Sequence, residues 1–560
     1  MSRKTVTPVD KAWLRMEDPT NLMMITGVMV FGTPMEYDRL KATIESRLLR
    51  FDRFHQRVVQ SRLFPGTFYW EDDAHFDIDQ HLHRITLSSP GDRQALQDLA
   101  GELMSTPLDF SKPLWELHLV EEYQSGCALI ARLHHAIADG IALVQVLLSL
   151  TDDQPDAPWP DEKPATESAQ GRGLWQAATR PARVALKTTS KVSGTIVREG
   201  RQSLRHPGHG FELVKDGARL AKATARLLLL WPDPKTPLKG KLNPPKRAAW
   251  SAPIPLEEVK GAGQAMGGTI NDILLTVVTG ALRRYLQAQG AKVENLNFRA
   301  VVPVNLRPQD EELQLGNKFG LVFLSLPVGI EDPVERLREL KRRMDALKDT
   351  PEPIAAFGIL TAIGIAPACV QDVVVTIFGA KGTGVMTNVP GPRETIYLAN
   401  SPLETIMFWV PQSGHLGLGV SIISYAGQVR VGIATDHGLI PDPDQIVSAY
   451  RAEFDALVEL AHQQDVTTRE DLATEPASPE SIAETTIALR AAIEKINAYL
   501  ESLDQADRET VVAKEEPKAG VPAQTPLDAA VDRCQALTKT GRQCRNRPLE
   551  GQRFCHVHQP

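Results

Sequence analysis

Residues 127–150, CALIARLHHAIADGIALVQVLLSL, place two adjacent histidines and an Asp-Gly pair between two apolar runs. The first run predicts a buried strand, and the second, which follows Asp139-Gly140, predicts a buried helix. The histidines therefore lie where a strand ends and a helix soon begins. Loops beyond strand ends often carry the binding and catalytic groups of α/β folds, so this junction is the first candidate site.

The length and composition predict a multidomain globular protein. The chain has 560 residues, which is too many for one hydrophobic core, and is 42% hydrophobic and 23% charged. Its net charge of -7 excludes a generally basic nucleic-acid binder, so no nucleic acid is expected as a partner. The N-terminus has no apolar secretory signal, and the longest uncharged apolar stretch, about 354–370, contains Pro367 and is too short for a membrane span. We therefore expect a cytoplasmic protein.

Shifts in pattern divide the chain into five parts. Strand-like and helix-like segments alternate in the first and third parts, which predicts two α/β domains joined by a linker. In the third part, a turn at Ala426-Gly427 joins two strand-like runs and is compatible with a hairpin. The five parts are 1–150, 151–247 (linker and basic connector), 248–465, 466–529 (helix and acidic linker) and 530–560 (cysteine-rich tail).

The connector at 172–247 is strongly basic, with 17 Lys and Arg against 4 Asp and Glu. One interpretation is a solvated helical connector. The other is a patch that contacts anionic lipid headgroups, which attract clustered Lys and Arg side chains.

A heptad pattern follows the second domain at residues 480–505. Apolar residues recur every seven positions at Ile482, Leu489, Ile496 and Leu503. Three to four heptads are marginal for an isolated coiled coil. The segment is therefore expected either to pair with itself, giving a homo-oligomer, or to fold back on the rest of the chain.

The chemistry of His134 and His135 can be narrowed by elimination. A single histidine on an apolar face is usually a satisfied core residue, but two at a strand end beside Asp139-Gly140 are less easily explained so. Adjacent strand residues point to opposite faces, so both imidazoles are not expected to reach one metal ion. No G-x-S-x-G, P-loop or clean G-x-G-x-x-G motif is present. What remains is one histidine facing a cleft as a general base, with the other packed or supporting.

Several motifs together resemble a known family. HHAIADG at 134–140 resembles the HHxxxDG motif of bacterial wax ester synthase/acyl-CoA:diacylglycerol acyltransferases. The accompanying motifs are similar and occur in the family's order: PVDKAWLRMEDP, Pro113-Leu114-Trp115, Asn271-Asp272, VPVNLRP, LGNKFG and TNVPGP. Met23-Met24 departs from the family's usual Met-His without touching a catalytic role. The resemblance covers roughly residues 5–462.

The resemblance implies a fold and an activity. The fold is two chloramphenicol acetyltransferase-like domains, each a mixed α/β sheet flanked by helices, with a tunnel between them. The activity is transfer of a fatty acyl group from acyl-CoA to a long-chain alcohol or to diacylglycerol. Acyl-CoA is then a substrate, no cofactor is needed for catalysis, and the lipid acceptors imply a location at the inner membrane face or at lipid inclusions.

The resemblance also implies roles for the motif residues. His135 is the general base, and His134 supports it. Asp139 either orients the imidazole in a triad or, as we prefer, turns away and pairs with a buried arginine whose position the sequence does not reveal. Asn271 is a candidate for orienting the substrate or stabilising the oxyanion, as are backbone N–H groups near 269–272. Pro113, Leu114 and Trp115 are expected to be structural or to line the tunnel.

Two other functions compete with this one. A condensation-type domain of the same fold would join carrier-bound acyl groups to amines, although no carrier or adenylation segment adjoins. A degenerate member would only bind lipid droplets, which the intact HHxxxDG motif disfavours.

The tail predicts a structural zinc module. Cys534, Cys544 and Cys555, with His558 as the preferred fourth ligand and His556 as the alternative, form a closed tetrahedral set of sulfur and nitrogen donors. Such a short segment has too few apolar residues to fold without a metal. The competing interpretation is three stray thiols in a basic tail. A disulfide framework would leave one cysteine over.

Overall fold

The computed structural model describes residues 3–64, 66–159, 219–307, 315–348, 350–412 and 416–474, with two isolated positions at 490 and 494. Residues 160–218 of the linker, most of the heptad segment and the whole tail lie outside the described residues. The predicted zinc ligands Cys534, Cys544, Cys555 and His558 are therefore not described. The chain divides into two compact units, Met1–Asp471 and Leu472–Pro560, and almost all described residues belong to the first.

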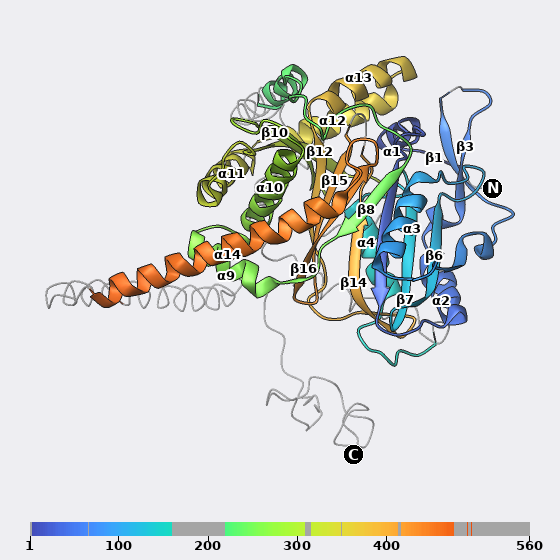
Figure 1. Cartoon of the computed structure of the whole chain (residues 1–560). Helices are drawn as coiled ribbons and strands as arrows, with labels where there is room; N and C mark the ends of the chain where they lie inside the picture. The colour runs from blue at the N-terminus through green and yellow to red at the C-terminus, as the bar shows by residue number, and fades with distance from the viewer. Residues whose placement is uncertain are drawn as a thin grey trace, which may run out of the picture. The chain divides into compact units, whose positions relative to one another are not determined.

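A six-stranded mixed sheet positions the histidine motif (Figure 1). Only its β5–β6 pair is parallel, and the other neighbouring strands are antiparallel. β7 lies inside the sheet between β2 and β6, so both of its edges are hydrogen-bonded to neighbouring strands. In order across the sheet the strands are β13 (Tyr397–Leu398), β14 (Ser401–Trp409), β2 (Met24–Phe31), β7 (Gly126–His134), β6 (Trp115–Tyr123) and β5 (Leu82–Thr86).

The alternation along β7 divides its side chains between two apolar cores. Cys127, Leu129 and Ala131 face one core, which is shared with the helix that follows the motif. Ala128 and Ile130 face another core on the opposite side of the sheet. Burial of both faces explains why the strand sequence is almost wholly apolar rather than alternating.

A seven-stranded mixed sheet forms the centre of the second half. β10–β12 and β12–β15 are parallel pairs, while the remaining pairs are antiparallel. Ala426 and Gly427 both adopt positive φ between β15 and β16, which is the two-residue turn that a tight hairpin requires. The order is β11 (Phe319–Leu326), β10 (Phe298–Asn305), β12 (Gly384–Pro390), β15 (Leu418–Tyr425), β16 (Gln428–Asp436) and β8 (Lys246–Trp250), with β9 (Ile254–Pro255) also paired to β16.

One strand crosses from the second half of the sequence into the first sheet. β14 belongs to the predicted part 248–465, yet it pairs antiparallel with β2 from Leu403 opposite Phe31 to Trp409 opposite Thr26. The sequence did not indicate this pairing of β14 with β2. It ties the two sheets together through the backbone, so the first sheet is complete only when residues from the second half are present.

Helices flank both sheets, and side chains cap their first turns. Thr269 and Asp272 form a reciprocal capping box at α10, while Asp92 and Asp139 cap α3 and α4. The helices are α1 (Pro8–Arg15), α2 (Tyr37–Thr43, continued by a π-helix at Ile44–Leu48), α3 (Arg93–Ser105), α4 (Gly140–Leu150), an unlabelled helix at 219–229, α9 (Leu256–Met266), α10 (Ile270–Ala288), α11 (Pro333–Lys348), α12 (Glu352–Ile365), α13 (Ala368–Ala380) and α14 (Pro443–Thr474).

A small third sheet stands beside the N-terminus. It consists of β1 (Arg3–Thr5), β4 (Phe68–Asp72) and β3 (Gln56–Gln60), all antiparallel. The tip of its β3–β4 hairpin exposes Leu63 and Phe64. Two short 3₁₀ helices, Asp52–Phe54 and Ile78–Gln80, complete the described elements of this region.

No single helix within the described ranges is long and apolar enough to cross a membrane. The apolar stretch at 354–370 is divided between α12 and α13, and Pro367 stands before α13 as its cap. α9 and α10 together would have the length and composition of a span, but they are bent by 95°. Most α10 side chains are buried in the core around the second sheet.

Candidate active site

His135 is the residue just beyond β7, and its backbone is held on both sides. Its N–H donates to the Met23 carbonyl at 2.7 Å, and its carbonyl accepts from the Asn317 side-chain amide at 2.7 Å. The residue is 4% exposed. The β7 alternation places its ring on the same side as Leu133, facing the first core.

Two aromatic residues from distant parts of the chain enclose the His135 ring. Trp13 of α1 stacks on it with ring centroids 4.1 Å apart and an interplanar angle of 20°. Phe319 of β11 lies 5.6 Å away by the same measure and is tilted by 48°. The ring therefore has little rotational freedom. The sequence placed Trp13 and Phe319 in recognised motifs but assigned neither a role, because nothing local links them to His135.

Burial lowers the pKa of His135 to about 4, and the negative charge of Asp139 opposes this shift only in part. The imidazole is therefore neutral at physiological pH, as a proton acceptor must be. Its Nδ1 atom is buried without a hydrogen-bond partner among the described residues. A neutral, rigidly held imidazole can receive a proton, although its low pKa makes it a weak base in the unliganded protein.

His134 points to the opposite side of the sheet and is fully buried. Its Nδ1 accepts the Ala136 backbone N–H at 3.0 Å, which places the proton of the neutral ring on Nε2. Nε2 lies 3.4 Å from a carboxylate oxygen of Glu17, and Glu17 also accepts the Met23 N–H at 2.6 Å. These contacts brace the turn after β7, which fits the supporting role predicted for His134.

Asp139 makes no hydrogen bond to the His135 ring among the described residues, and its carboxylate binds structural partners instead. One of its carboxylate oxygens accepts the Ala142 N–H at 3.0 Å and so caps α4. The other accepts the Lys318 N–H at 2.9 Å and forms an ion pair with Arg307. Arg307, from the VPVNLRP motif, is the arginine that the sequence could not identify. The geometry is that of the structural alternative rather than of a triad.

A second buried network fixes the turn from the other side. Arg53 donates to the carbonyl groups of Ala136 and Ile137 at 2.8 and 2.6 Å and pairs with Asp10 at 2.9 Å. Asn317 donates to the other oxygen of Asp10 at 2.8 Å as well as to the His135 carbonyl. No motif in the sequence marks Arg53. Asp10 and Asn317 lie in the PVDKAWLRMEDP and LGNKFG motifs, and that position is the only signal of a role that the sequence offers.

Trp115 of the PLW motif packs into the core. It is fully buried, donates its indole N–H to the Phe54 carbonyl at 2.8 Å and stacks on His81. The neighbouring Leu114 carbonyl accepts the His134 N–H at 2.9 Å. These contacts are structural, in agreement with one of the two roles expected for the motif.

Asn271 and Asp272 are not brought to His135 by a contact within the described ranges. Asn271 accepts a hydrogen bond from Asn388 of β12 at 2.6 Å, and its amide lies 4.0 Å from the Met344 sulfur. Asp272 accepts the N–H of Thr269 at 2.8 Å, so a carboxylate already compensates the positive end of α10. That arrangement disfavours an oxyanion at this helix terminus, and the catalytic role of Asn271 stays a prediction.

One group of side chains among the described residues could hold a metal ion by proximity. Donor atoms of His83, Glu116 and His118 lie within 4.8 Å of one another. However, Arg132 pairs with Glu116 at 2.6 Å, and the two imidazoles are stacked with centroids 5.0 Å apart. The positive guanidinium and the stacked rings make this cluster a poor cation site.

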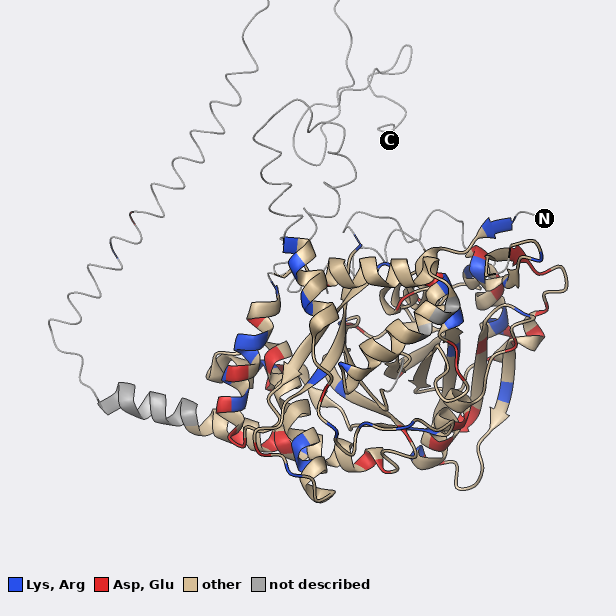
Figure 2. Cartoon of the chain, turned by 90° about the horizontal axis from the view of Figure 1, so that it is seen from above, with Lys and Arg blue, Asp and Glu red and all other residues tan. Residues whose placement is uncertain are grey.

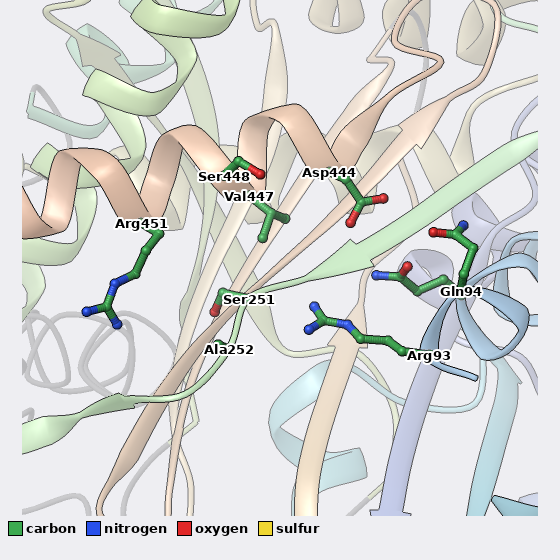
Figure 3. A pocket seen from close by; sticks show the side chains of 9 residues that line it. Arg93, Gln94, Ser251, Ala252, Asp444, Val447, Ser448 and Arg451 are labelled. Atoms are coloured by element: carbon green, nitrogen blue, oxygen red, sulfur yellow. The ribbon is translucent and has the colours of Figure 1, made fainter. Parts of the chain in front are cut away.

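An open pocket lies under the N-terminal part of α14 and shares no residue with the surroundings of His135. Its volume is about 450 Å³, and it extends from the start of α3 to the chain after β8. Figure 3 shows Arg93 reaching across from α3 toward Ser251, with Asp444 of α14 above them. This pocket is therefore separate from the candidate site at His135.

The same family accounts for both halves of the chain. Residues 6–274 match the wax ester synthase/diacylglycerol acyltransferase catalytic domain, and residues 315–458 match the C-terminal domain of that family. The chain belongs to the wax ester synthase/diacylglycerol acyltransferase family. The prediction made from HHAIADG and its accompanying motifs is thereby confirmed.

Named relatives and solved structures agree with this family. A protein of Mycobacterium tuberculosis provisionally named a diacylglycerol O-acyltransferase is 27% identical over 81% of this chain and 90% of its own length. A probable diacylglycerol O-acyltransferase of the same organism is 26% identical over 83% of this chain and 98% of its own. The wax ester synthase/diacylglycerol acyltransferase of Marinobacter aquaeolei VT8 is 22% identical, with a TM-score of 0.58 over 82% of this chain and all of its own.

A more distant structure has the same architecture. The first condensation domain of the CDA synthetase gives a TM-score of 0.50 at 14% identity, over 82% of this chain and 96% of its own. At this identity the likeness concerns the fold alone. The mixed α/β fold that the resemblance implied is thus confirmed. The family models end at residue 458, before the predicted zinc ligands, and the zinc module stays a prediction.

Proposed function

We propose that the protein is an O-acyltransferase that moves a fatty acyl group from acyl-CoA to the hydroxyl of a long-chain alcohol or a diacylglycerol. The observation that carries this proposal is the neutral imidazole of His135, held between Trp13 and Phe319 in a chain of the wax ester synthase/diacylglycerol acyltransferase family. The names of the relatives support diacylglycerol as an acceptor, and the name of the Marinobacter structure supports both products.

His135 acts as the general base in this mechanism. It takes the proton of the acceptor hydroxyl while that oxygen attacks the thioester carbonyl, so a C–O bond forms and the C–S bond then breaks. The proton passes from the imidazolium to the departing sulfur and yields free CoA. A thiol of this kind has a pKa near 8.5, so its thiolate leaves far more readily than an alkoxide. Neither an acyl-enzyme nor a cofactor is therefore required.

The other motif residues keep the base in place. Asp139 and Arg307 fix the loop beyond His135. Asn317 donates to the His135 carbonyl, and Arg53 donates to the carbonyl of Ala136 in the same loop. Positioning of this kind contributes to rate because a displaced base loses its alignment with the attacking hydroxyl. Substrates are expected to meet His135 through a tunnel between the domains, which stays a prediction.

A direct assay tests the proposal. Purified full-length protein is incubated with radiolabelled palmitoyl-CoA and one acceptor at a time: hexadecanol, a dioleoylglycerol or a hydrophobic primary amine. Labelled ester and an equal amount of free CoA are expected with at least one hydroxyl acceptor, and none is expected from the His135→Ala protein. The ratio of wax ester to triacylglycerol then gives the acceptor preference.

The other outcomes identify the competing functions. Amide formation without ester would favour the condensation-type alternative. Lipid binding with no CoA release from any acceptor would favour a degenerate lipid-droplet protein. Either result would contradict the proposed activity.

A further inference from the structure

Exposed apolar side chains gather at one end of the molecule from three separate elements. In Figure 1, α13, the short helix at 219–229 and the tip of the hairpin next to β3 all lie at the top. The large apolar residues exposed there, hereafter the apolar end, are Leu63, Phe64, Leu228, Leu229, Trp231, Ile365, Val370, Val373 and Ile377. Trp231 is 83% exposed and Leu63 84%, which is unusual for such large side chains.

Hydrogen bonds show that the three elements are neighbours. Arg15 donates to the Ala366 carbonyl at 2.8 Å and to the Gly66 carbonyl at 3.1 Å, which joins the α12–α13 corner to the hairpin tip. Lys381, just after α13, donates to the carbonyl groups of Leu227 and Leu228 at 2.7 and 2.8 Å. The segments that carry the exposed residues are therefore joined to one another at this end of the molecule.

The α13 part of this surface has the pattern of a helix lying on an apolar phase. Val370, Val373 and Ile377 follow one another at intervals of three and four residues, so they share one face of the helix. Residues 352–380 contain no Lys or Arg and only two acidic residues, Glu352 and Asp372. An exposed apolar patch of this composition marks an interaction site.

Positive charge borders the apolar end. Arg62 precedes the exposed Leu63, and Lys222 and Arg226 lie on the helix that ends at Leu228 and Leu229, although Arg226 pairs with Glu352 at 3.2 Å. Figure 2 looks down on this end and shows long tan helical stretches beside a helix that carries several blue residues. The same helix lies within the basic connector 172–247, with its 17 Lys and Arg against 4 Asp and Glu.

The apolar end is also close to the reaction site through one helix. α1 packs against α12, with Ala12, Leu360 and Ile363 in one small core, and Gln371 of α13 donates to the Ala12 carbonyl at 3.0 Å. The next residue, Trp13, is the one that stacks on His135. A surface that contacts the apolar end is therefore separated from the catalytic candidate by little more than α1.

We infer that the apolar end is the surface by which the protein docks on an anionic lipid bilayer. The exposed Val, Ile and Leu side chains insert below the headgroups, Trp231 lies at the interface, and the bordering Lys and Arg contact anionic headgroups. An uncharged helix face bordered by Lys and Arg is the combination that an anionic bilayer binds, which favours a lipid surface over a protein partner. This inference concerns binding and does not depend on the proposed acyl transfer.

Vesicle flotation of the full-length chain tests it. Wild-type protein is mixed with phosphatidylcholine vesicles that contain about 30% phosphatidylglycerol, and the bound fraction is measured against lipid concentration. The Val373→Glu/Ile377→Glu protein should bind at least about tenfold more weakly, because two carboxylates on the exposed apolar face of α13 oppose its insertion into the bilayer. The matched control, Ala265→Glu/Ala452→Glu, adds the same charge at exposed positions of α9 and α14 and should bind like wild type.

Further measurements keep the result unambiguous. Circular dichroism and light scattering establish that each variant is folded and report its oligomeric state. Removing phosphatidylglycerol, or adding 0.5 M salt, should weaken wild-type binding because the basic border is screened. Equal vesicle binding by the two double variants would overturn the inference. So would a wild-type dimer that the Val373→Glu/Ile377→Glu change converts to a monomer while vesicle binding persists, since the apolar end would then be a contact between copies.

Discussion

His134 and His135 are consecutive, identical in type and both buried, yet their surroundings differ on every point. His134 lies on one side of the sheet, where its Nδ1 accepts a backbone N–H and its Nε2 faces Glu17. His135 lies on the other side, enclosed by Trp13 and Phe319, with an unpartnered Nδ1 and a pKa of about 4. The His134 imidazole is engaged in structural contacts, whereas the His135 imidazole keeps a nitrogen without a partner among the described residues.

This difference follows from the two-residue period of a strand. Successive side chains point to opposite faces, so a doubled histidine at the end of β7 supplies one ring to each side. One ring can then hold the turn in shape while the other faces the reaction. The turn after the two histidines leads directly into α4, whose cap is Asp139.

The largest expected effect comes from removing the available ring. His135→Phe keeps an aromatic group against Trp13 but removes the proton acceptor, so kcat/KM should fall by about 10²–10⁴-fold. CoA release with palmitoyl-CoA and the preferred acceptor measures this loss, and thermal unfolding checks that the variant stays folded. A variant within threefold of wild type would show that His135 is not the base.

Asp139→Ala should act mainly on stability. It leaves the largely buried Arg307 without its carboxylate partner and removes the cap of α4, so the free energy of unfolding should fall by roughly 3–5 kcal/mol. Urea unfolding measures this change, and Asp139→Asn, which can retain the cap acceptor, should lose less. An inactive Asp139→Ala protein of unchanged stability would instead favour the triad role.

A smaller effect is expected at His134. His134→Leu leaves the buried Ala136 N–H without an acceptor, which should cost about 1–3 kcal/mol of stability. His134→Asn can supply an oxygen near the position of Nδ1 and should recover part of that loss, with activity within tenfold of wild type. If the Asn variant were as inactive as His135→Phe, His134 would have to take part in the chemistry.

The smallest expected change is in the pH dependence of the reaction. Because the pKa of His135 is lowered to about 4, kcat/KM should vary less than about threefold between pH 8 and 5.5. A base with the ordinary pKa near 6.5 would lose about tenfold over that range. An acid limb centred at pH 6.5 would contradict the buried, neutral state described for His135 in the free protein.

The same lowered pKa affects stability in a defined direction. Unfolded His135 takes up a proton near pH 6.5 while the folded form does not, so its contribution to stability is present above that pH and is lost toward pH 4. His81 and His83 also have pKa values lowered by burial and act in the same direction. Urea midpoints measured from pH 7.5 to 5 should therefore decrease.

The sequence predicted the local features of this region and not its long-range partners. The apolar runs around HHAIADG predict β7 and α4, and strand alternation predicts that His134 and His135 lie on opposite faces. Arg307, the partner of Asp139, is 168 positions away, and Asn317 is 182 positions from His135, so no periodicity or spacing links them. Asn271 shows the converse, because a motif marks the residue in the sequence while its contact with Asn388 depends on how α10 meets β12.

The pairing of β14 with β2 affects how this chain folds while it is being synthesised. The edge of β2 that pairs with β14 has no partner until the ribosome has made residue 409. At roughly 5–20 residues per second, that edge waits about 20–75 s after β2 itself is made. An unpaired strand edge of this kind is a template for wrong association, so the nascent first half has to be kept apart from its copies by chaperones or by its own incomplete packing until the second half arrives.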